Sequence, residues 1–321
     1  MKHGALDATT LDTVMSAVLA APTVHHGQPW RLRADRDAGT IELTANTERQ
    51  LPHADPVGRI LLLAAGAALF NLRVAAAHVG WRLRLTTLPS PEHPEVLAVA
   101  QVADADGDRG DAVSAQRTDL YDALWNGTRG RFPSVNQPLP PAVVTGMEAA
   151  AEGEGARLRF ADHGETRRLL ALTAEAEARN IVDPERRDES RRWIHDLGSF
   201  GVSPVGPHQA PRPGLVDDLT ALLHHSPPVE VYESNPILAV LSTAHDRRTD
   251  WLAAGEALEH ARLVATRQAV HVSWLYQALE WADLRERLGD PDRDAGPVHM
   301  LVRLGYATPP GRLEAGAPRH R

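Results

Sequence analysis

The sequence predicts an α+β fold made of two similar halves, on the evidence of two internal repeats. Seven of the thirteen residues from Ala64 to Ala76 recur unchanged 189 positions later, between Ala253 and Ala265. The residues Arg-Leu-Arg at 31–33 and Asp35 recur 126 and 127 positions later, within 157–162. Alanine-rich helices also match by chance, but a second match in the same order favours a duplicated unit. The offsets differ by about 63 residues, which predicts an insertion between Asp162 and Ala253.

Each element of the first half follows from its residue pattern. Apolar residues at helical spacing predict a helix over 6–21, which Pro22 ends. Alternation over 30–33 and 40–44 predicts a hairpin that turns around 37–39. The stretch 58–79 is apolar nearly all round and predicts a helix buried against other helices. Strands are expected over 81–88 and 96–102, followed by a glycine-rich acidic linker over 104–111.

The second half is expected to repeat this order around its insertion. The insertion contains two charged helical stretches, 164–180 and 184–196, followed by a loop with little periodicity, 198–207. Such loops are either functional covers or surface excursions without a role, and both interpretations stay open. We assign residues 1–112 to the first half and 113–321 to the second, with an inserted lid at about 163–235. The apolar helices 58–79 and 251–270 are expected to pack together at the core, around a central antiparallel sheet.

Composition and charge exclude several classes of protein. The chain has 321 residues, of which 42 are acidic and 34 basic, and its net charge of −8 has the wrong sign for a nucleic-acid-binding surface. The absence of cysteine excludes disulfides, thiolate nucleophiles and cysteine-bound metal centres. The first ten residues lack the apolar core of a signal peptide, and the longest apolar run, 60–72, is too short to span a bilayer. We therefore expect a soluble cytoplasmic protein that binds neither nucleic acid nor membrane.

The segment 21–30 is the strongest candidate for a ligand-binding loop. It reads Ala-Pro-Thr-Val-His-His-Gly-Gln-Pro-Trp and concentrates hydroxyl, imidazole and amide groups between a helix end and a strand. It resembles the flavin-binding loop of the nitroreductase superfamily, which commonly reads Ala-Pro-Ser-x-x-Asn-x-Gln-Pro-Trp. Within that superfamily it is most similar to the Acg-type proteins, in which two nitroreductase halves are fused in one chain. The stretches 66–72, 251–258 and 301–306 also resemble the family, so the resemblance covers nearly the full length.

The resemblance implies an FMN-dependent nitroreductase-like fold in which two fused halves form a pseudo-dimer. Ordinary nitroreductases are homodimers that bind FMN between subunits, one supplying basic groups for the phosphate and the other the Pro-Ser-x-x-Asn loop. Here one chain mimics the homodimer, so it can act as a monomer. In the second half the acidic stretch 150–155 replaces the loop and would repel a phosphate. We therefore predict one FMN per chain.

The resemblance also implies which residues contact FMN. The loop residues are Pro22, Thr23, His25, His26 and Gln28. The candidates for the phosphate are arginines, because guanidinium groups bind phosphate bidentately, and they are Arg129, Arg131, Arg319 and Arg321. A third segment resembles the family's Ser-Pro-Leu-x-Gln stretch that faces the ring, and it supplies Ser273, Trp274 and Leu275. His26 stands where the family has Asn, and Trp274 where it has Pro.

The function implied is hydride transfer from NAD(P)H through FMN to a nitroaromatic or quinone-type acceptor. No catalytic residue is assigned, because the flavin itself carries the hydride. The alternatives are a flavin-sequestering or storage protein whose inserted segment covers the ring, a specialised flavin oxidase, and a cofactor-free descendant. The 16 histidines include no His-Glu-x-x-His helix, so no metal site is expected. The glycines around Ser203 do not have the spacing of a serine-hydrolase elbow.

Overall fold

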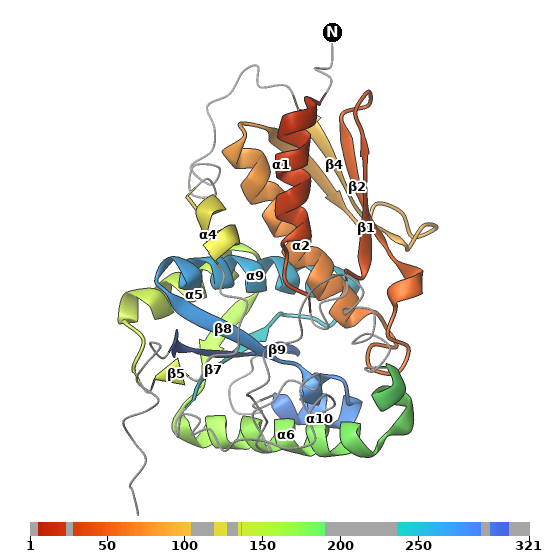
Figure 1. Ribbon diagram of the computed structural model, residues 1–321. Helices are drawn as coiled ribbons and strands as arrows, with labels where there is room; N and C mark the ends of the chain where they lie inside the picture. The colour runs from red at the N-terminus through yellow and green to blue at the C-terminus, as the bar shows by residue number, and fades with distance from the viewer. Residues whose placement is uncertain are drawn as a thin grey trace, which may run out of the picture.

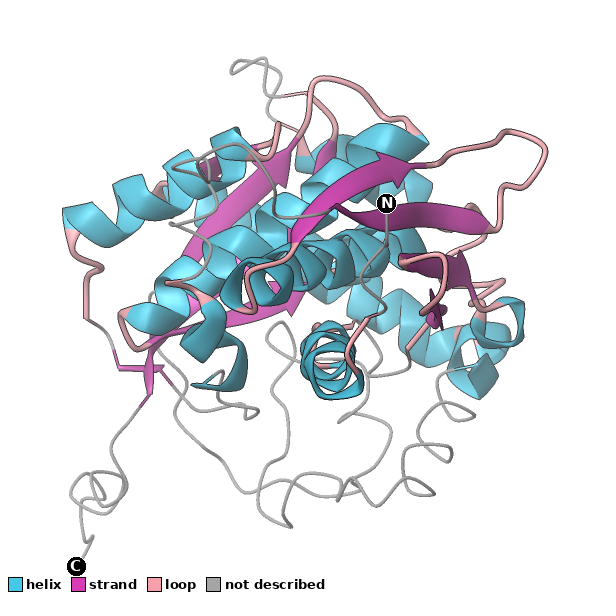
Figure 2. Ribbon diagram, turned by 90° about the horizontal axis from the view of Figure 1, so that it is seen from above, coloured by secondary structure: helices cyan, strands magenta, loops and turns pink. Residues whose placement is uncertain are grey.

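The computed structural model describes residues 6–23, 28–103, 119–126, 134–135, 137–189, 236–289 and 296–307. These residues form an α+β fold of helices and antiparallel strands (Figure 2). In Figure 1 the first half stands above the second, and helix α9 (Arg248–Arg267) runs between them. The predicted linker 104–111 and the boundary at 112–113 lie outside the described residues.

The elements of the first half agree with the sequence prediction in type and order. Asp7 begins the first helix by accepting a hydrogen bond from the Thr10 amide at 2.9 Å. Gly39, with φ of +64°, makes the turn between the first two strands, because glycine adopts positive φ without steric cost. The elements are α1 (Ala8–Leu19), β1 (Trp30–Asp35), β2 (Thr40–Ala45), η1 (Thr47–Arg49), α2 (Arg59–His78), β3 (Arg82–Thr87) and β4 (Val96–Ala103).

The second half contains the same core elements with additions. The elements are α4 (Tyr121–Asn126), β5 (Ser134–Val135), α5 (Pro141–Gly153), β6 (Arg157–Phe160), α6 (His163–Val182), β7 (Ile237–Ser242), α9, β8 (Val270–Leu275), η2 (Gln277–Leu279), α10 (Ala282–Leu288) and β9 (Val298–Ala307). Helix α6 belongs to the predicted insertion, and it buries Leu169, Leu172 and Ala176 in the core of the second half. The rest of the predicted lid, 190–235, lies outside the described residues.

Strand pairing confirms that the two halves repeat one topology. The first sheet has the order β1-β2-β4-β3, and the second has the same order, β6-β7-β9-β8, with β5 added on β9. The irregularities also correspond, because the register shifts after Leu43 in β2 and after Leu241 in β7. Residues at the same place in both ladders are called equivalent below, such as Thr44 and Ser242. The structure corrects the expectation of one central sheet, since each half has its own sheet and the helices α2 and α9 lie between them.

Helix α2 is the core helix that the sequence predicts. It is long and apolar enough to cross a membrane, but 89% of its most apolar window is buried inside the protein. Its apolar circumference is therefore explained by contacts on all sides, with α1, α9 and the first sheet. Helix α4 comes after the predicted linker in sequence but packs against the first half. Ala123 and Leu124 of this helix, and Leu120 just before it, belong to the core of the first half.

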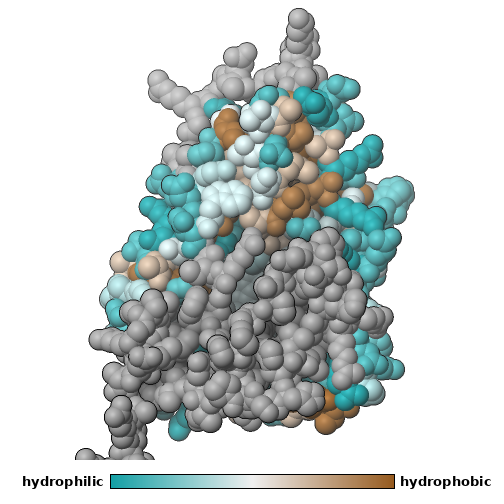
Figure 3. Space-filling view, viewed as in Figure 1, coloured by the Kyte–Doolittle hydropathy of each residue, from teal (hydrophilic) through white to brown (hydrophobic). Residues whose placement is uncertain are grey.

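The face seen in Figure 3 carries only small apolar areas among hydrophilic ones on its described surface. The large apolar side chains exposed on the described part of the protein are Leu19, Val57, Trp125, Ile181 and Val182. Singly exposed apolar side chains are normal on folded proteins.

Candidate functional site

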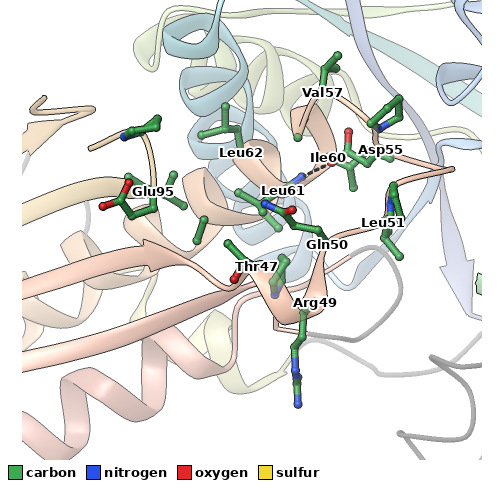
Figure 4. Close-up of a pocket in the computed structure, with 18 of the residues that line it drawn as sticks. Thr47, Arg49, Gln50, Leu51, Asp55, Val57, Ile60, Leu61, Leu62 and Glu95 are labelled. Carbon is green, nitrogen blue, oxygen red and sulfur yellow. Dashed lines mark hydrogen bonds between the residues drawn. The ribbon is translucent and has the colours of Figure 1, made fainter. Parts of the chain in front are cut away.

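A cavity of about 630 Å³ opens in the first half, between the inner face of its sheet and the beginning of α2. Thr47, Gln50 and Leu61 lie close together in Figure 4, whereas Arg49 extends away from them. The wall is mainly apolar, with a few polar and charged groups, as in most small-molecule sites. It consists of Thr23, Pro29, Ala45, Thr47, Arg49, Gln50, Leu51, Pro52, Asp55, Pro56, Val57, Gly58, Ile60, Leu61, Leu62, Ala64, Pro94, Glu95, Leu97 and Arg248.

The predicted flavin-binding loop borders this cavity. Thr23 and Pro29, which stand near the two ends of the loop, both belong to the wall. The side-chain amide of Gln28 donates a hydrogen bond of 3.4 Å to the Leu19 carbonyl and so ties the loop to the end of α1. Pro22 is half-buried, and His25 and His26 lie outside the described residues. The structure thus places both described ends of the loop against one cavity.

Chain connections of different length explain why this cavity lies in the first half. The connection from β2 to α2, residues 46–58, supplies much of the wall, whereas the equivalent connection in the second half is only residues 243–247. The other connection differs in the opposite sense, because residues 88–95 link β3 to β4 but residues 276–297 link β8 to β9. That longer connection carries η2 and α10, and it buries Leu279, Leu284 and Leu288 in the second core.

Buried polar side chains occupy the equivalent place in the second half. Ala45 and Leu97 of the cavity wall are equivalent to Thr243 and His299, which are both buried. The His299 Nε2 and Thr243 Oγ1 atoms lie 2.6 Å apart, and the Thr243 hydroxyl donates to the His245 carbonyl at 2.7 Å. His299 must therefore be the donor to Thr243, which leaves Nδ1 without a proton. Burial and the charge of Arg59 lower the pKa of His299 to about 4.

Three charged side chains of the cavity wall have different partners in the protein. The carboxylate of Asp55 accepts a hydrogen bond of 2.9 Å from the Leu61 amide, and burial nevertheless raises the pKa of Asp55. The Oε1 atom of Glu95 lies 3.2 Å from the Nδ1 atom of His93, and both side chains are exposed. Arg248 is exposed and donates to the Pro94 carbonyl at 2.7 Å. The acidic groups of the wall thus already have partners in the protein.

The predicted ring-facing segment of the second half lies on β8 and not in the cavity wall. Ser273 is exposed, Trp274 packs partly against the second core, and Leu275 is buried in it. Strand β8 ends close to the beginning of α2, because the Leu279 carbonyl just beyond it accepts a hydrogen bond of 2.7 Å from Arg59 Nη2. The phosphate candidates Arg129, Arg131, Arg319 and Arg321 lie outside the described residues. The described residues therefore leave the assignment of FMN contacts as a prediction.

Sequence reasoning missed most of the cavity wall. The connection 46–58 has no periodicity, and its proline and glycine residues indicate only a loop. Arg248 could have been found, because it is equivalent to Arg59 at the repeat offset of 189 and both begin a core helix. Among the described residues, no group of three or more His, Asp or Glu side chains is arranged to hold a metal ion.

Comparison with known proteins identifies relatives along nearly the whole chain. No family model matches it. The Mycobacterium tuberculosis protein named "Putative NAD(P)H nitroreductase Rv3131" is 31% identical over 314 residues, 94% of this chain and 86% of that protein. Another from the same organism, "Putative NAD(P)H nitroreductase acg", is 27% identical over 93% of this chain and 90% of its own length. A crystal structure of a nitroreductase with bound FMN from Bacteroides fragilis aligns with a TM-score of 0.35 at 14% identity, over 64% of this chain and 94% of that one.

Proposed function

The chain belongs to the nitroreductase family, and on that premise we propose that it binds FMN and passes hydride from NAD(P)H to a nitroaromatic or quinone-type acceptor. The observation that carries this proposal is the cavity of about 630 Å³ bordered by both ends of the flavin-like loop. Its size falls within the range of about 300 to 1,000 Å³ that small-molecule sites occupy. Arg248 of the second half joins the residues of the first half in the wall, so we also propose that a single chain is the functional unit.

The residues of the cavity fit the demands of a flavin ring. A planar heterocycle needs a dry space with apolar surfaces on its faces and a few hydrogen-bonding groups at its edge. Leu97 and Ala45 on the sheet and Ile60 and Leu61 on α2 supply the apolar surfaces. Thr23 supplies a hydroxyl group, and His25 and His26 are the further candidates from the same loop. We propose that Arg129, Arg131, Arg319 and Arg321 hold the phosphate.

The chain's own part in the reaction is to bind and orient. When bound, FMN supplies the hydride-carrying atom, so no side chain has to form a covalent bond with the substrate. The apolar wall would exclude water from the reacting face, which strengthens the remaining electrostatic interactions there. Asp55 is positioned by the first turn of α2 and holds its carboxylate in the wall through the Leu61 amide.

The proposal is tested with the full chain and a variant that fills the cavity. Ala45→Phe should abolish FMN binding, measured by flavin fluorescence quenching, because it places a ring between the sheet and α2. Ala38→Phe, in the exposed hairpin turn, is the matched control and should bind FMN like the original protein. Thermal unfolding verifies that each variant folds, and Ile60→Trp replaces Ala45→Phe if that variant does not. Unchanged FMN affinity in a folded, filled variant would contradict the location of the site.

Reduction of the bound flavin separates the possible activities. The proposal predicts that NADH or NADPH bleaches the flavin absorbance under anaerobic conditions and that a nitroaromatic or quinone restores it. A flavin that neither nucleotide reduces would instead indicate a storage protein. A flavin that is reduced by another substrate and reoxidised only by oxygen would indicate an oxidase. Absence of flavin binding would contradict the proposed function altogether.

A further inference from the structure

Arg248 is a residue that the second half contributes to the cavity of the first. It is the first residue of α9, its side chain is exposed, and it belongs to the cavity wall. Its Nη2 atom donates to the Pro94 carbonyl at 2.7 Å. It forms no ion pair with any residue that the structure describes. A guanidinium group has five N–H donors, so this single bond leaves most of them for a ligand.

The equivalent arginine shows what the same position does when its side chain is buried. Arg59 begins α2, and its Nη2 atom donates to the Leu279 carbonyl at 2.7 Å. Each arginine therefore reaches across the boundary between the halves and binds a carbonyl in the opposite half's connection between its last two sheet strands. Arg59 is only 3% exposed, and burial together with the charge of Arg285 lowers its pKa to about 10. Both arginines make the same kind of contact, but only Arg248 is exposed and belongs to the cavity wall.

The acidic side chains of the wall have partners other than Arg248 among the described residues. The carboxylate of Asp55 is occupied by the Leu61 amide, and Glu95 is paired with His93. Arg49, the second cation of the wall, extends away from Gln50 and Leu61 in Figure 4 and has another interaction in the protein. Arg248 is thus the wall cation whose partner is a neutral carbonyl.

We propose that Arg248 binds a phosphoryl group of the ligand in this cavity and so ties α9 of the second half to a ligand held mainly by the first. The inference rests on the proposed function, which supplies two sources of such a group, FMN and the nicotinamide nucleotide. The chemistry is the same in both, since guanidinium donors match phosphate oxygens in pairs. Arg248 could keep its hydrogen bond to the Pro94 carbonyl or exchange it for one to the phosphoryl group. In neither case would an ion pair with a described residue have to break.

Pairs of ligands that differ by one phosphate test the inference and identify the source. The variant is Arg248→Gln, and the control is Arg267→Gln, which removes an exposed arginine from the other end of the same helix. If Arg248 binds the flavin phosphate, Arg248→Gln weakens FMN about ten- to hundred-fold and leaves riboflavin unchanged. If it binds the nucleotide, the loss appears for NADPH or NADH while FMN affinity is retained, and a loss confined to NADPH identifies the additional phosphate.

A purely structural arginine gives a different result. Arg248→Gln would then lower the unfolding temperature and change the affinities for FMN, riboflavin and both nucleotides by the same factor or not at all, which overturns the inference. Arg248→Lys should recover only part of the phosphate-dependent affinity, because an ammonium group lacks the paired donors. Binding of inorganic pyrophosphate to the flavin-free protein, measured by calorimetry, gives an independent readout. Loss of that binding in Arg248→Gln supports the inference even if the proposed redox activity fails, and equal binding contradicts it.

Discussion

Gly66 and Gly255 make the same contact in opposite directions at the crossing of α2 and α9. A Cβ atom on Gly66 would lie 2.1 Å from the Leu252 carbonyl oxygen, and one on Gly255 would lie 2.1 Å from that of Leu63. Gly255 follows Gly66 by the repeat offset of 189 residues, and Leu252 follows Leu63 by the same offset. The crossing is therefore a pseudo-twofold contact, and glycine allows the two backbones to approach closely.

Alanine at either glycine should destabilise the protein. Gly66→Ala is expected to lower the free energy of unfolding by about 1–3 kcal/mol or more, because the added methyl group meets backbone rather than a movable side chain. Urea denaturation measures the change. Gly153→Ala is the control, since nothing lies within 4 Å of a Cβ at that helix end. A Gly66→Ala variant as stable as the original would show that the helices are not in this contact.

Glu256 should make the junction of the halves sensitive to pH. Arg73 Nη1 contacts the carboxylates of Glu256 and Glu154, and His260 lies 3.3 Å from Glu154. Burial raises the pKa of Glu256 to about 7 from 4.5 despite Arg73, whereas the pKa of Glu154 is lowered by its bonds to His260 and Arg73. Between pH 4.5 and about 7, Glu256 therefore binds more protons in the native state than in the unfolded state. Its contribution to stability consequently falls as the pH rises through this range.

The pH effect of Glu256 can be isolated by substitution. Glu256→Gln should remove a loss on the order of 3 kcal/mol that the original protein shows between the ordinary pKa of 4.5 and about 7. The measurement is the free energy of unfolding across that pH range. Glu152→Gln, an exposed change at the end of α5, should leave the original slope intact. Identical slopes in all three proteins would mean that Glu256 is ionised throughout.

His299 should act in the opposite sense on the acid side. Its folded pKa of about 4 lies below its ordinary value of 6.5, so its contribution to stability is present above pH 6.5 and is lost as pH falls toward 4. The added proton would sit on Nδ1, which has no hydrogen-bond partner among the described residues. His299→Leu, which copies the equivalent Leu97, should remove an acid-side loss on the order of 3 kcal/mol. His163→Leu, on the exposed start of α6, should keep that loss in the same unfolding series.

Arg131 should contribute to FMN affinity through its charge. Arg131→Gln is expected to weaken FMN binding about ten- to hundred-fold, since a hydrogen bond to a charged group contributes roughly 1.5–3 kcal/mol. Riboflavin, which lacks the phosphate, should bind the variant and the original protein equally. Arg84→Gln, an exposed change on β3, serves as the control for net charge. Equal losses for FMN and riboflavin would remove Arg131 from the phosphate site.

Periodicity and the repeat predict most of the fold. The alternation around Gly39, the apolar circumference of α2 and the recurrence of Arg31-Leu32-Arg33 at 157–159 predict the hairpin, the core helix and the duplication that the structure confirms. The number of sheets was not predictable in this way. Pairing between strands is non-local, and an alternating pattern shows which face is buried but not which strands share a sheet.

The candidate site was predictable only in part, because much of its wall belongs to a loop without a regular residue pattern. Thr23 was predicted from the loop motif, and both it and Pro29, near the other end of that loop, border the cavity. The connection 46–58 has no motif, and its role depends on its length relative to 243–247. His299 also shows this limit, because its burial follows from its place beside Thr243 and not from its neighbours in sequence.

The ratio of FMN to protein at saturation tests the central claim most directly. The two halves share one topology, but buried Thr243 and His299 stand in the second half at the positions where Ala45 and Leu97 line the cavity of the first. The measurement is a titration of the flavin-free chain with FMN, followed by fluorescence quenching and verified by the mass of the intact complex. One FMN bound per chain is the predicted result. Two FMN per chain, or none at saturating concentration, would contradict the account.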